Sequence, residues 1–192
     1  MRIISGAFRG RRLQGPSGRA LRPTGDRLKE SFFNILGTGV QDATVLDGFA
    51  GTGAVGLEAL SRGAREVVFI ESDRDAVRLI RKNLQICGVT SGYRLLQEDI
   101  FTSMRALSRD GFCADIAFLD PPYHWGPYHD LIGTLFATGV ASADSRVILE
   151  HHRKADVPAA GSAFRRVRIL RQSDKCMSFY LASGPGDLCE TR

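Results

Sequence analysis

The feature that most constrains this chain is the regular alternation of short apolar runs with amphipathic stretches through its middle. Strands that alternate with helices and are apolar on both faces favour a parallel sheet covered by helices on both sides. We therefore expect an α/β, doubly wound fold. The apolar runs predict strands at 44–49, 65–72, 93–99, 115–120 and 146–150, and helical spacing predicts helices at 26–36, 54–60, 74–87, 101–108 and 129–138.

The pattern changes after Pro158. Residues 164–170 and 177–181 alternate as strands do, and the short segment between them has no room for a helix, which predicts an antiparallel hairpin at the end of the sheet. We expect one folded domain over 41–183. A basic arm and a helix packed on that domain precede it at 1–40, and a loose tail follows at 184–192.

The composition excludes several classes of protein. The chain has 192 residues, of which 43% are hydrophobic and 24% charged, as in an ordinary globular domain. No apolar run approaches the ~18 residues of a membrane span, and the first residues lack the apolar core of a signal peptide, so we expect a cytoplasmic protein. The four cysteines are far apart, and the histidines lack acids or thiols at ligand spacing, so we expect neither disulfides nor a metal site.

Basic residues are concentrated at the start of the chain. Residues 1–30 contain eight Lys or Arg residues and only two acids, whereas the whole chain has a net charge of +5. Glycines and a proline interrupt this segment, which favours an extended basic arm attracted to a polyanion, although a merely solvated surface fits the charge equally well. A second basic cluster lies near the other end, at Arg165, Arg166, Arg168 and Arg171.

A glycine loop follows the first predicted strand. Residues 51–56 match G-x-G-x-x-G between a strand and a helix, and Glu71 ends the next strand, so the pattern satisfies the dinucleotide-binding fingerprint. The charges favour a different ligand. Four successive strands end in acids, and a pyrophosphate placed beside them would meet a repulsion of roughly 1 kcal/mol per close pair even in water. These acids are Asp47, Glu71, Asp99 and Asp120.

A cationic cofactor suits this edge of the sheet better. S-adenosylmethionine carries a sulfonium and an ammonium group, and its ribose diol requires an acceptor such as the carboxylate of Glu71. Asp47 would face the ammonium, Asp99 would accept from the adenine amino group, and Gly51 and Gly53 would allow a close approach. We add the neighbouring residues Phe49, Ser72 and Ile100 to the candidate cofactor site.

The tetrapeptide Asp120, Pro121, Pro122, Tyr123 follows the fourth predicted strand. The prolines hold Asp120 extended and offer no N–H groups, so the turn presents acceptors without competing donors. The Asp120 side chain and the Pro121 carbonyl can each take one hydrogen of an exocyclic nucleobase amine, and Tyr123 can stack on an unstacked or flipped base. This pattern predicts transfer of a methyl group to a base nitrogen.

Three segments resemble the bacterial RsmD-type methyltransferases, which modify the N2 amine of a guanine in 16S ribosomal RNA. The segments are 2–30, with Arg2-Ile3-Ile4-Ser5-Gly6 and Arg22-Pro23-Thr24-Gly25-Asp26; 46–63, around Asp47-Gly48-Phe49-Ala50-Gly51; and 119–123. The resemblance implies a class I (Rossmann-like) S-adenosylmethionine-dependent methyltransferase fold with a terminal hairpin. It also implies 16S ribosomal RNA as the partner, in the small ribosomal subunit or its precursor.

The resemblance also assigns further residues. It implies that Pro23 and Thr24 close over the cofactor and that five basic residues contact RNA phosphates: Arg9, Arg11, Arg12, Arg27 and Lys29. Three alternatives remain open from the residues themselves. These are a DNA or RNA adenine-N6 methyltransferase using the same tetrapeptide, an NAD-dependent oxidoreductase, and a non-catalytic ribosome assembly factor.

Overall fold

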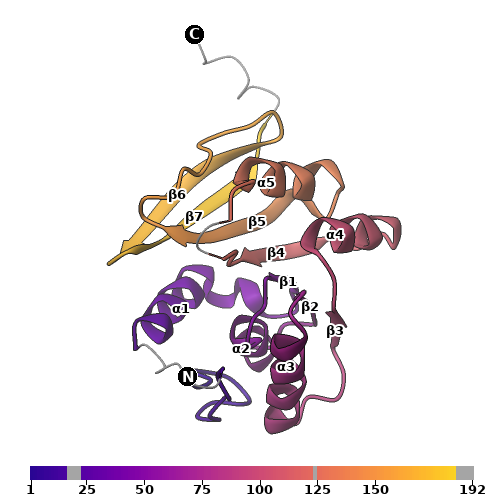
Figure 1. Ribbon diagram of the computed structural model, residues 1–192, viewed down its shortest axis with the longest axis vertical. Helices are drawn as coiled ribbons and strands as arrows, with labels where there is room; N and C mark the ends of the chain where they lie inside the picture. The colour runs from indigo at the N-terminus through magenta and orange to yellow at the C-terminus, as the bar shows by residue number, and fades with distance from the viewer. Residues whose placement is uncertain (17–22, 123–124, 185–192) are drawn as a thin grey trace. The chain divides into compact units, whose positions relative to one another are not determined.

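Three short parallel strands form the centre of the first of two units into which the chain divides, residues 1–100 and 101–192 (Figure 1). The computed structural model describes residues 1–16, 23–122 and 125–184, with the backbone alone for 23–27. The elements of the first unit are α1 (Pro23–Leu36), a short 3-10 helix η1 (Gly37–Val40), β1 (Thr44–Gly48), α2 (Ala54–Ser61), β2 (Glu66–Ile70), α3 (Arg74–Cys87) and β3 (Tyr93–Leu96).

The strands of the first unit lie in the order β3-β2-β1. β1 and most of β2 are buried, as expected for apolar strands covered on both faces. Because the strands are parallel and paired in register, Gly48 opposite Ile70 and Ile70 opposite Leu96, their carboxyl ends lie along one edge. Asp47, the fourth residue of β1, and Glu71, the first residue after β2, therefore lie at the same edge.

The second unit contains a mixed sheet in the order β4-β5-β7-β6, in which β4 and β5 are parallel and β7 is antiparallel to both of its neighbours. β6 is the edge strand of this unit, and Figure 1 shows it beside β7. A bulge lies between Arg166 and Arg168, and Val167 at the bulge is 43% exposed. The elements are α4 (Ile100–Arg109), β4 (Ala114–Leu119), α5 (Tyr128–Ala137), β5 (Ala141–His152), β6 (Phe164–Gln172) and β7 (Lys175–Ala182).

Most predicted elements are present. The helix at 74–87 has the predicted bounds, with Asp73 capping its first turn and Gly88 in the left-handed conformation after its last turn. The predicted terminal hairpin is β6 and β7. Three bounds differ by three positions or more: α1 begins at Pro23 rather than at Asp26, β3 ends at Leu96 rather than at Asp99, and β5 begins at Ala141, five positions before the predicted start.

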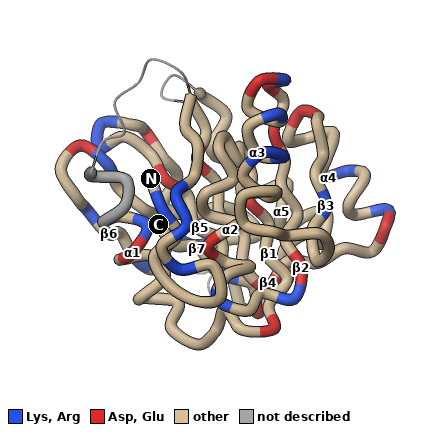
Figure 2. Tube along the Cα trace, turned by 90° about the horizontal axis from the view of Figure 1, so that it is seen from below, with Lys and Arg blue, Asp and Glu red and all other residues tan. Residues whose placement is uncertain are grey.

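The N-terminal basic segment differs from the extended arm that we expected. Residues 1–16 form a tight hairpin-like loop, in which Ile3 and Arg11 are hydrogen-bonded and Arg2 pairs with Arg12 in an isolated antiparallel bridge. Ile3 and Leu13 are 1% and 4% exposed. This segment is therefore part of the first unit's packed structure, because its apolar side chains are buried while its arginines remain outside. Figure 2 shows basic positions in blue beside the label of the N-terminus.

None of the helices formed by the described residues is long and apolar enough to cross a membrane. Within the described ranges, no group of three or more His, Cys, Asp and Glu side chains is arranged to hold a metal ion.

Candidate functional site

The glycine loop between β1 and α2 is held by two carboxylates. Asp47, in β1, is 2% exposed, and its Oδ2 accepts a hydrogen bond of 2.8 Å from the N–H of Gly56 in α2. Glu71, just after β2, accepts through Oε2 from the N–H of Gly51, also at 2.8 Å. The first unit therefore brings Asp47, Glu71 and the loop together, as we predicted from the ends of the strands.

The loop conformation explains its glycines. Gly51 and Gly53 have positive φ angles of 56° and 74°, a conformation that residues with a side chain rarely adopt. Among the described residues, a Cβ on Gly51 would meet only the carbonyl oxygen of Phe49, 3.9 Å away, so these residues leave the space beside Gly51 open to a ligand. A Cβ on Gly56 would lie 2.2 Å from the Phe69 ring, so this glycine serves the packing of α2 on β2. Phe49 itself has a φ of 61°, an uncommon conformation of the kind found at ligand sites.

The two acids differ in their electrostatics. Burial raises the pKa of Asp47 to about 7; the hydrogen bond from Gly56 opposes this shift and the negative charge of Glu71 adds to it. Glu71 is half-buried and also accepts from the N–H of Asp73 through Oε1 at 2.9 Å. Because a carboxylate has about four lone-pair positions, two remain on Glu71 for the hydroxyl groups of a ligand.

Some of the other predicted cofactor residues lie near the same edge of the sheet, and the side chains of the rest are not described by the structure. Glu71 donates its N–H to the carbonyl of Leu96, so the chain leaves β3 beside it. Ser72 and Asp99 are exposed, and Ile100 begins α4 with 3% exposure. Pro23 and Thr24 form the first turn of α1, but their side chains, like that of Arg27, are outside the described atoms.

The tetrapeptide follows β4 in the second unit. Asp120 and Pro122 are exposed, Pro121 is buried, and Tyr123 lies outside the described residues. The carbonyl of Pro122 accepts from the N–H of Trp125 at 2.9 Å, which closes the turn. The Asp120 carboxylate is thus presented at the end of a buried strand, at the start of a turn shaped by two prolines.

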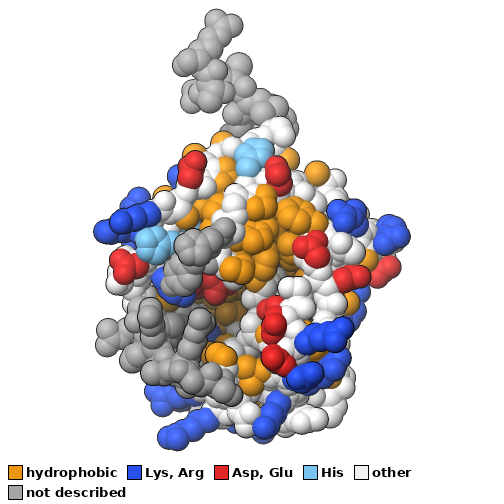
Figure 3. All heavy atoms as spheres, viewed as in Figure 1, with side chains coloured by type: hydrophobic (Ala, Val, Ile, Leu, Met, Phe, Trp, Pro, Cys, Tyr) orange, Lys and Arg blue, Asp and Glu red, His pale blue; other side chains and the backbone are white. Residues whose placement is uncertain are grey.

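Aromatic side chains hold the far end of this turn. The Trp125 ring is stacked on Phe101 with centroids 6.1 Å apart and meets Tyr128 edge-on at 5.6 Å. Burial raises the pKa of Tyr128, and the negative charge of Asp120 adds to this shift. Trp125 thus anchors the turn through its ring contacts with α4 and α5. Figure 3 shows hydrophobic side chains gathered over the region of α5.

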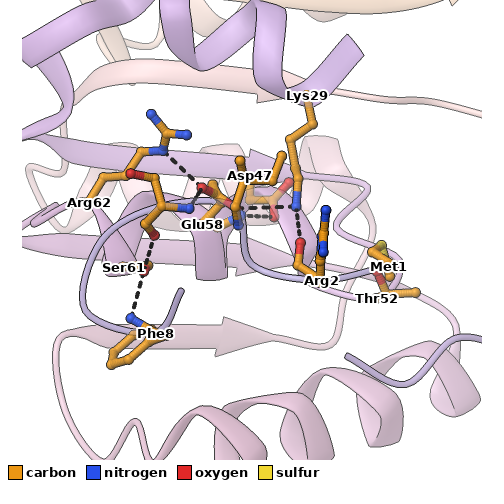
Figure 4. A network of polar contacts seen from close by, with 12 residues as sticks. Met1, Arg2, Phe8, Lys29, Asp47, Thr52, Glu58, Ser61 and Arg62 are labelled. Carbon is orange, nitrogen blue, oxygen red and sulfur yellow. Dashed lines mark hydrogen bonds and ion pairs between the residues drawn. The ribbon is translucent and has the colours of Figure 1, made fainter. Parts of the chain in front are cut away.

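Lys29, one of the predicted RNA contacts, is buried in the first unit. Lys29 is 6% exposed, its Nζ donates to the carbonyl of Arg2 at 2.9 Å, and it forms an ion pair of 3.3 Å with Glu58 (Figure 4). Its charge is neutralised inside the first unit, so it is not presented to a phosphate. Arg9, Arg11 and Arg12 are exposed, although Arg11 also donates to the carbonyl of Ile86 at 3.0 Å.

Three buried polar residues that sequence reasoning missed hold residues 1–16 in place: Glu58, Ser61 and Asn83. Glu58 is fully buried and accepts from the N–H groups of Ile4 and Ser5 and from the guanidinium of Arg62. Ser61 accepts from the N–H of Phe8 and donates to the carbonyl of Ser5 (Figure 4). A signal was present in the sequence for Asn83, since Ile80, Leu84 and Cys87 place it on the apolar face of α3.

Comparisons with known proteins agree with this arrangement. Residues 1–181 match the family described as Conserved hypothetical protein 95. The chain is 37% identical over 174 residues to the protein named Ribosomal RNA small subunit methyltransferase D of Escherichia coli (strain K12), covering 90% of this chain and 86% of the relative. It is also 34% identical to the solved structure of yhhF from Escherichia coli, with a TM-score of 0.79 over 95% of this chain and 97% of that one.

A more distant structure shows the fold class. The SAM Dependent Methyltransferase from Agrobacterium tumefaciens has a TM-score of 0.62 at 17% identity, over 84% of this chain and 63% of that one. The predicted α/β, Rossmann-like methyltransferase fold is therefore confirmed.

Proposed function

Because the chain belongs to the family described as Conserved hypothetical protein 95, which the resemblance to the RsmD type predicted, we propose that it transfers a methyl group from S-adenosylmethionine to the N2 amine of a guanine in 16S ribosomal RNA. The observation that carries the proposal is the glycine loop held between Asp47 and Glu71. The name of the Escherichia coli relative supports the choice of ribosomal RNA.

The first unit fits the methyl donor. The open space beside Gly51 admits a ligand, and the remaining lone pairs of Glu71 suit the two hydroxyls of a ribose. Asp47 is too deeply buried for much of its surface to touch a ligand. It therefore acts as a buried negative charge that favours a cation, and its hydrogen bond to Gly56 fixes the first turn of α2. The same charges disfavour a pyrophosphate, which argues against the NAD alternative.

The second unit supplies the groups that orient the acceptor. When bound, S-adenosylmethionine provides an electrophilic methyl group on a sulfonium. Asp120 and the carbonyl of Pro121 accept the two hydrogens of the amine, which fixes the nitrogen and directs its lone pair. Attack by this nitrogen on the methyl group would form the N–C bond, break the C–S bond and release S-adenosylhomocysteine. The alkylated nitrogen is strongly acidic and loses its proton without a strong base.

The RNA would be held by exposed arginines of residues 1–16. Arg9 and Arg12 are exposed on the hairpin-like loop, and their guanidinium groups suit phosphate oxygens. We place the acceptor in the small ribosomal subunit or its precursor, and the protein in the cytoplasm, where that substrate is found.

Mass spectrometry of nucleosides from small-subunit RNA tests the reaction. RNA from cells lacking the gene is incubated with the purified protein and S-adenosylmethionine, and with the Asp120→Ala variant as a control. We expect new N2-methylguanosine with the wild-type protein alone. N6-methyladenosine would instead establish an RNA adenine methyltransferase, and no new nucleoside in either naked RNA or intact subunits would contradict the proposed function.

A further inference from the structure

Asn83 links the N-terminal segment to the glycine loop. It lies on α3 and is fully buried. Its Oδ1 accepts from the N–H of Gln14 at 2.8 Å, and its Nδ2 donates to the carbonyls of Gln14 and Thr52 at 3.0 and 2.9 Å. Rotating the amide by half a turn would break all three bonds, so the contacts fix its orientation.

The two partners of Asn83 have different roles. Gln14 lies near the end of the described residues 1–16, while Thr52 lies between Gly51 and Gly53 in the glycine loop. The Oγ1 of Thr52 also approaches the Sδ of Met1 at 3.7 Å. The segment that carries Arg9 and Arg12 therefore meets the loop at both of its ends, through Met1 and through Gln14.

Two further anchors of the segment, Glu58 and Ser61, lie on α2. Glu58 and Ser61 anchor Ile4, Ser5 and Phe8 to α2. The segment also leaves little room at Gly6, where a Cβ would lie 1.7 Å from the carbonyl oxygen of Ser61. Docking is thus a defined state that is specified by buried polar contacts, and Asn83 alone among the three buried side chains joins it to the loop.

We propose that Asn83 is a positioning residue that couples docking of residues 1–16 to the binding-ready conformation of the glycine loop. Undocking the segment would remove both Gln14 contacts of Asn83 and free the amide that holds Thr52. A ligand on the loop favours the docked segment, and RNA on the docked segment favours the loop that binds the ligand. By linkage the two effects are equal, so cofactor and RNA strengthen each other's binding.

This inference rests on the proposed cofactor, so binding is measured first. Titration calorimetry with S-adenosylhomocysteine establishes whether the wild-type protein and each variant bind, and at what concentration they are saturated. A wild-type protein that does not bind S-adenosylhomocysteine contradicts the proposed function. A protein that binds it allows the coupling to be tested separately.

Amide hydrogen exchange, followed by mass spectrometry of peptides from residues 1–16, then tests the coupling without RNA. In the wild-type protein, saturating S-adenosylhomocysteine is expected to slow exchange in this segment by about fivefold or more, the lower end of typical coupling. The amides of Ile4, Phe8 and Gln14 report directly, because buried side chains accept from them. Unchanged exchange in the saturated wild-type protein overturns the proposal.

Two variants separate coupling from simple anchoring. Asn83→Ala removes the bridge through Gln14 and leaves only the Thr52–Met1 contact, so the slowing of exchange by S-adenosylhomocysteine should become much smaller than in the wild type. Ser61→Ala removes an anchor that does not contact the loop, so exchange should be faster throughout but still slow on adding the ligand. An equal ligand effect in Asn83→Ala and the wild type contradicts a role for Asn83. If Asn83→Ala does not fold, Asn83→Ser replaces it. The wild-type measurement does not depend on either variant, and unchanged exchange there still overturns the proposal.

Discussion

Asp47 combines deep burial with a position beside the candidate cofactor. Since its pKa is raised to about 7, it ionises as the pH rises through neutrality. A cationic ligand binds the ionised form better, so affinity for S-adenosylmethionine should rise with pH up to about 7. Below the pKa it should fall by as much as about tenfold per pH unit. Titration calorimetry at several pH values between about 5.5 and about 8.5 measures how the affinity for S-adenosylmethionine depends on pH.

Asp47→Asn is the matched control. The amide oxygen can still accept from Gly56, but the group no longer titrates in this range, so the slope should be lost and affinity at high pH should decrease. The same raised pKa affects stability. The folded protein holds this proton more tightly than the unfolded chain, so Asp47's contribution to stability falls as the pH rises from 3.8 to about 7. If the affinity of Asp47→Asn for S-adenosylmethionine depends on pH as steeply as that of the wild type, the assignment to Asp47 is contradicted.

Gly6 and Gly10 form a second matched pair. Their φ angles are 81° and 85°, but a Cβ on Gly6 would clash with the Ser61 carbonyl, whereas a Cβ on Gly10 would meet no atom of the described residues within 4 Å. Both alanine variants bear the cost of a positive φ, about 1 kcal/mol, and Gly6→Ala alone must also displace the segment. We expect urea denaturation to show a larger loss for Gly6→Ala. Equal losses in the free energy of unfolding would show that the segment can shift to accommodate the added methyl group of Gly6→Ala without destabilising the protein.

Helices with strong periodicity were the most predictable elements. The helix at 74–87 has an apolar stripe, a capping Asp73 and a terminal Gly88, and these local signals agree with one another. β5 was predicted too short because its first residues are polar. Ser145 is nevertheless buried, and its hydroxyl donates to the carbonyl of Ala114 at 2.6 Å, a contact between residues that are distant in sequence. Such pairing leaves no periodic signal.

The N-terminal segment shows the same limit more strongly. Its conformation depends on Glu58 and Asn83, which are more than fifty positions away from Ile4 and Gln14. Charge and glycine content described its surface correctly but not its docking. The proximity of Asp47 and Glu71 was predictable, because the carboxyl ends of neighbouring parallel strands lie at one edge. Their hydrogen bonds to the loop were not, since these depend on side-chain orientation.

Glu58 should dominate the stability of this segment. Glu58→Ala leaves Lys29 buried without its carboxylate and two N–H groups without an acceptor, and removing one partner of a buried ion pair costs about 3 to 5 kcal/mol. Asp75→Ala is the control, because its ion pair with Arg78 on α3 is largely exposed and is worth at most about 1 kcal/mol. Free energies of unfolding from urea titration compare them. A loss below about 1 kcal/mol for Glu58→Ala would contradict this role.

The basic segment should give RNA binding a measurable salt dependence. Replacing both Arg9 and Arg12 with glutamate should weaken binding to small ribosomal subunits and flatten the plot of log affinity against log salt concentration, because fewer counterions are released. Lys29→Met should leave that slope unchanged, since the Lys29 ammonium is buried against Glu58. Filter binding at several salt concentrations measures both slopes. A flatter slope for Lys29→Met would restore the original prediction for that residue.

At the scale of the whole molecule, the proposal divides the work between the two units. The first unit carries the glycine loop and its acids, and the second carries Asp120. Asp120→Ala should therefore reduce methyl transfer by at least about a hundredfold, a typical loss for one orienting group, while binding of S-adenosylmethionine is nearly unchanged. A radiolabel transfer assay and calorimetry on the same preparation test this. Collapse of cofactor affinity would refute the division.

The arrangement of β6 bears on how these molecules behave when crowded. A strand at the edge of a sheet is a template on which another chain can add, and long, flat, apolar edges aggregate. Here a bulge interrupts the edge, and Arg165, Arg168 and Arg171 are exposed along it. Two such strands brought together would repel each other and fit poorly. The same features that give β6 its irregular register therefore favour a protein that stays dispersed at high concentration.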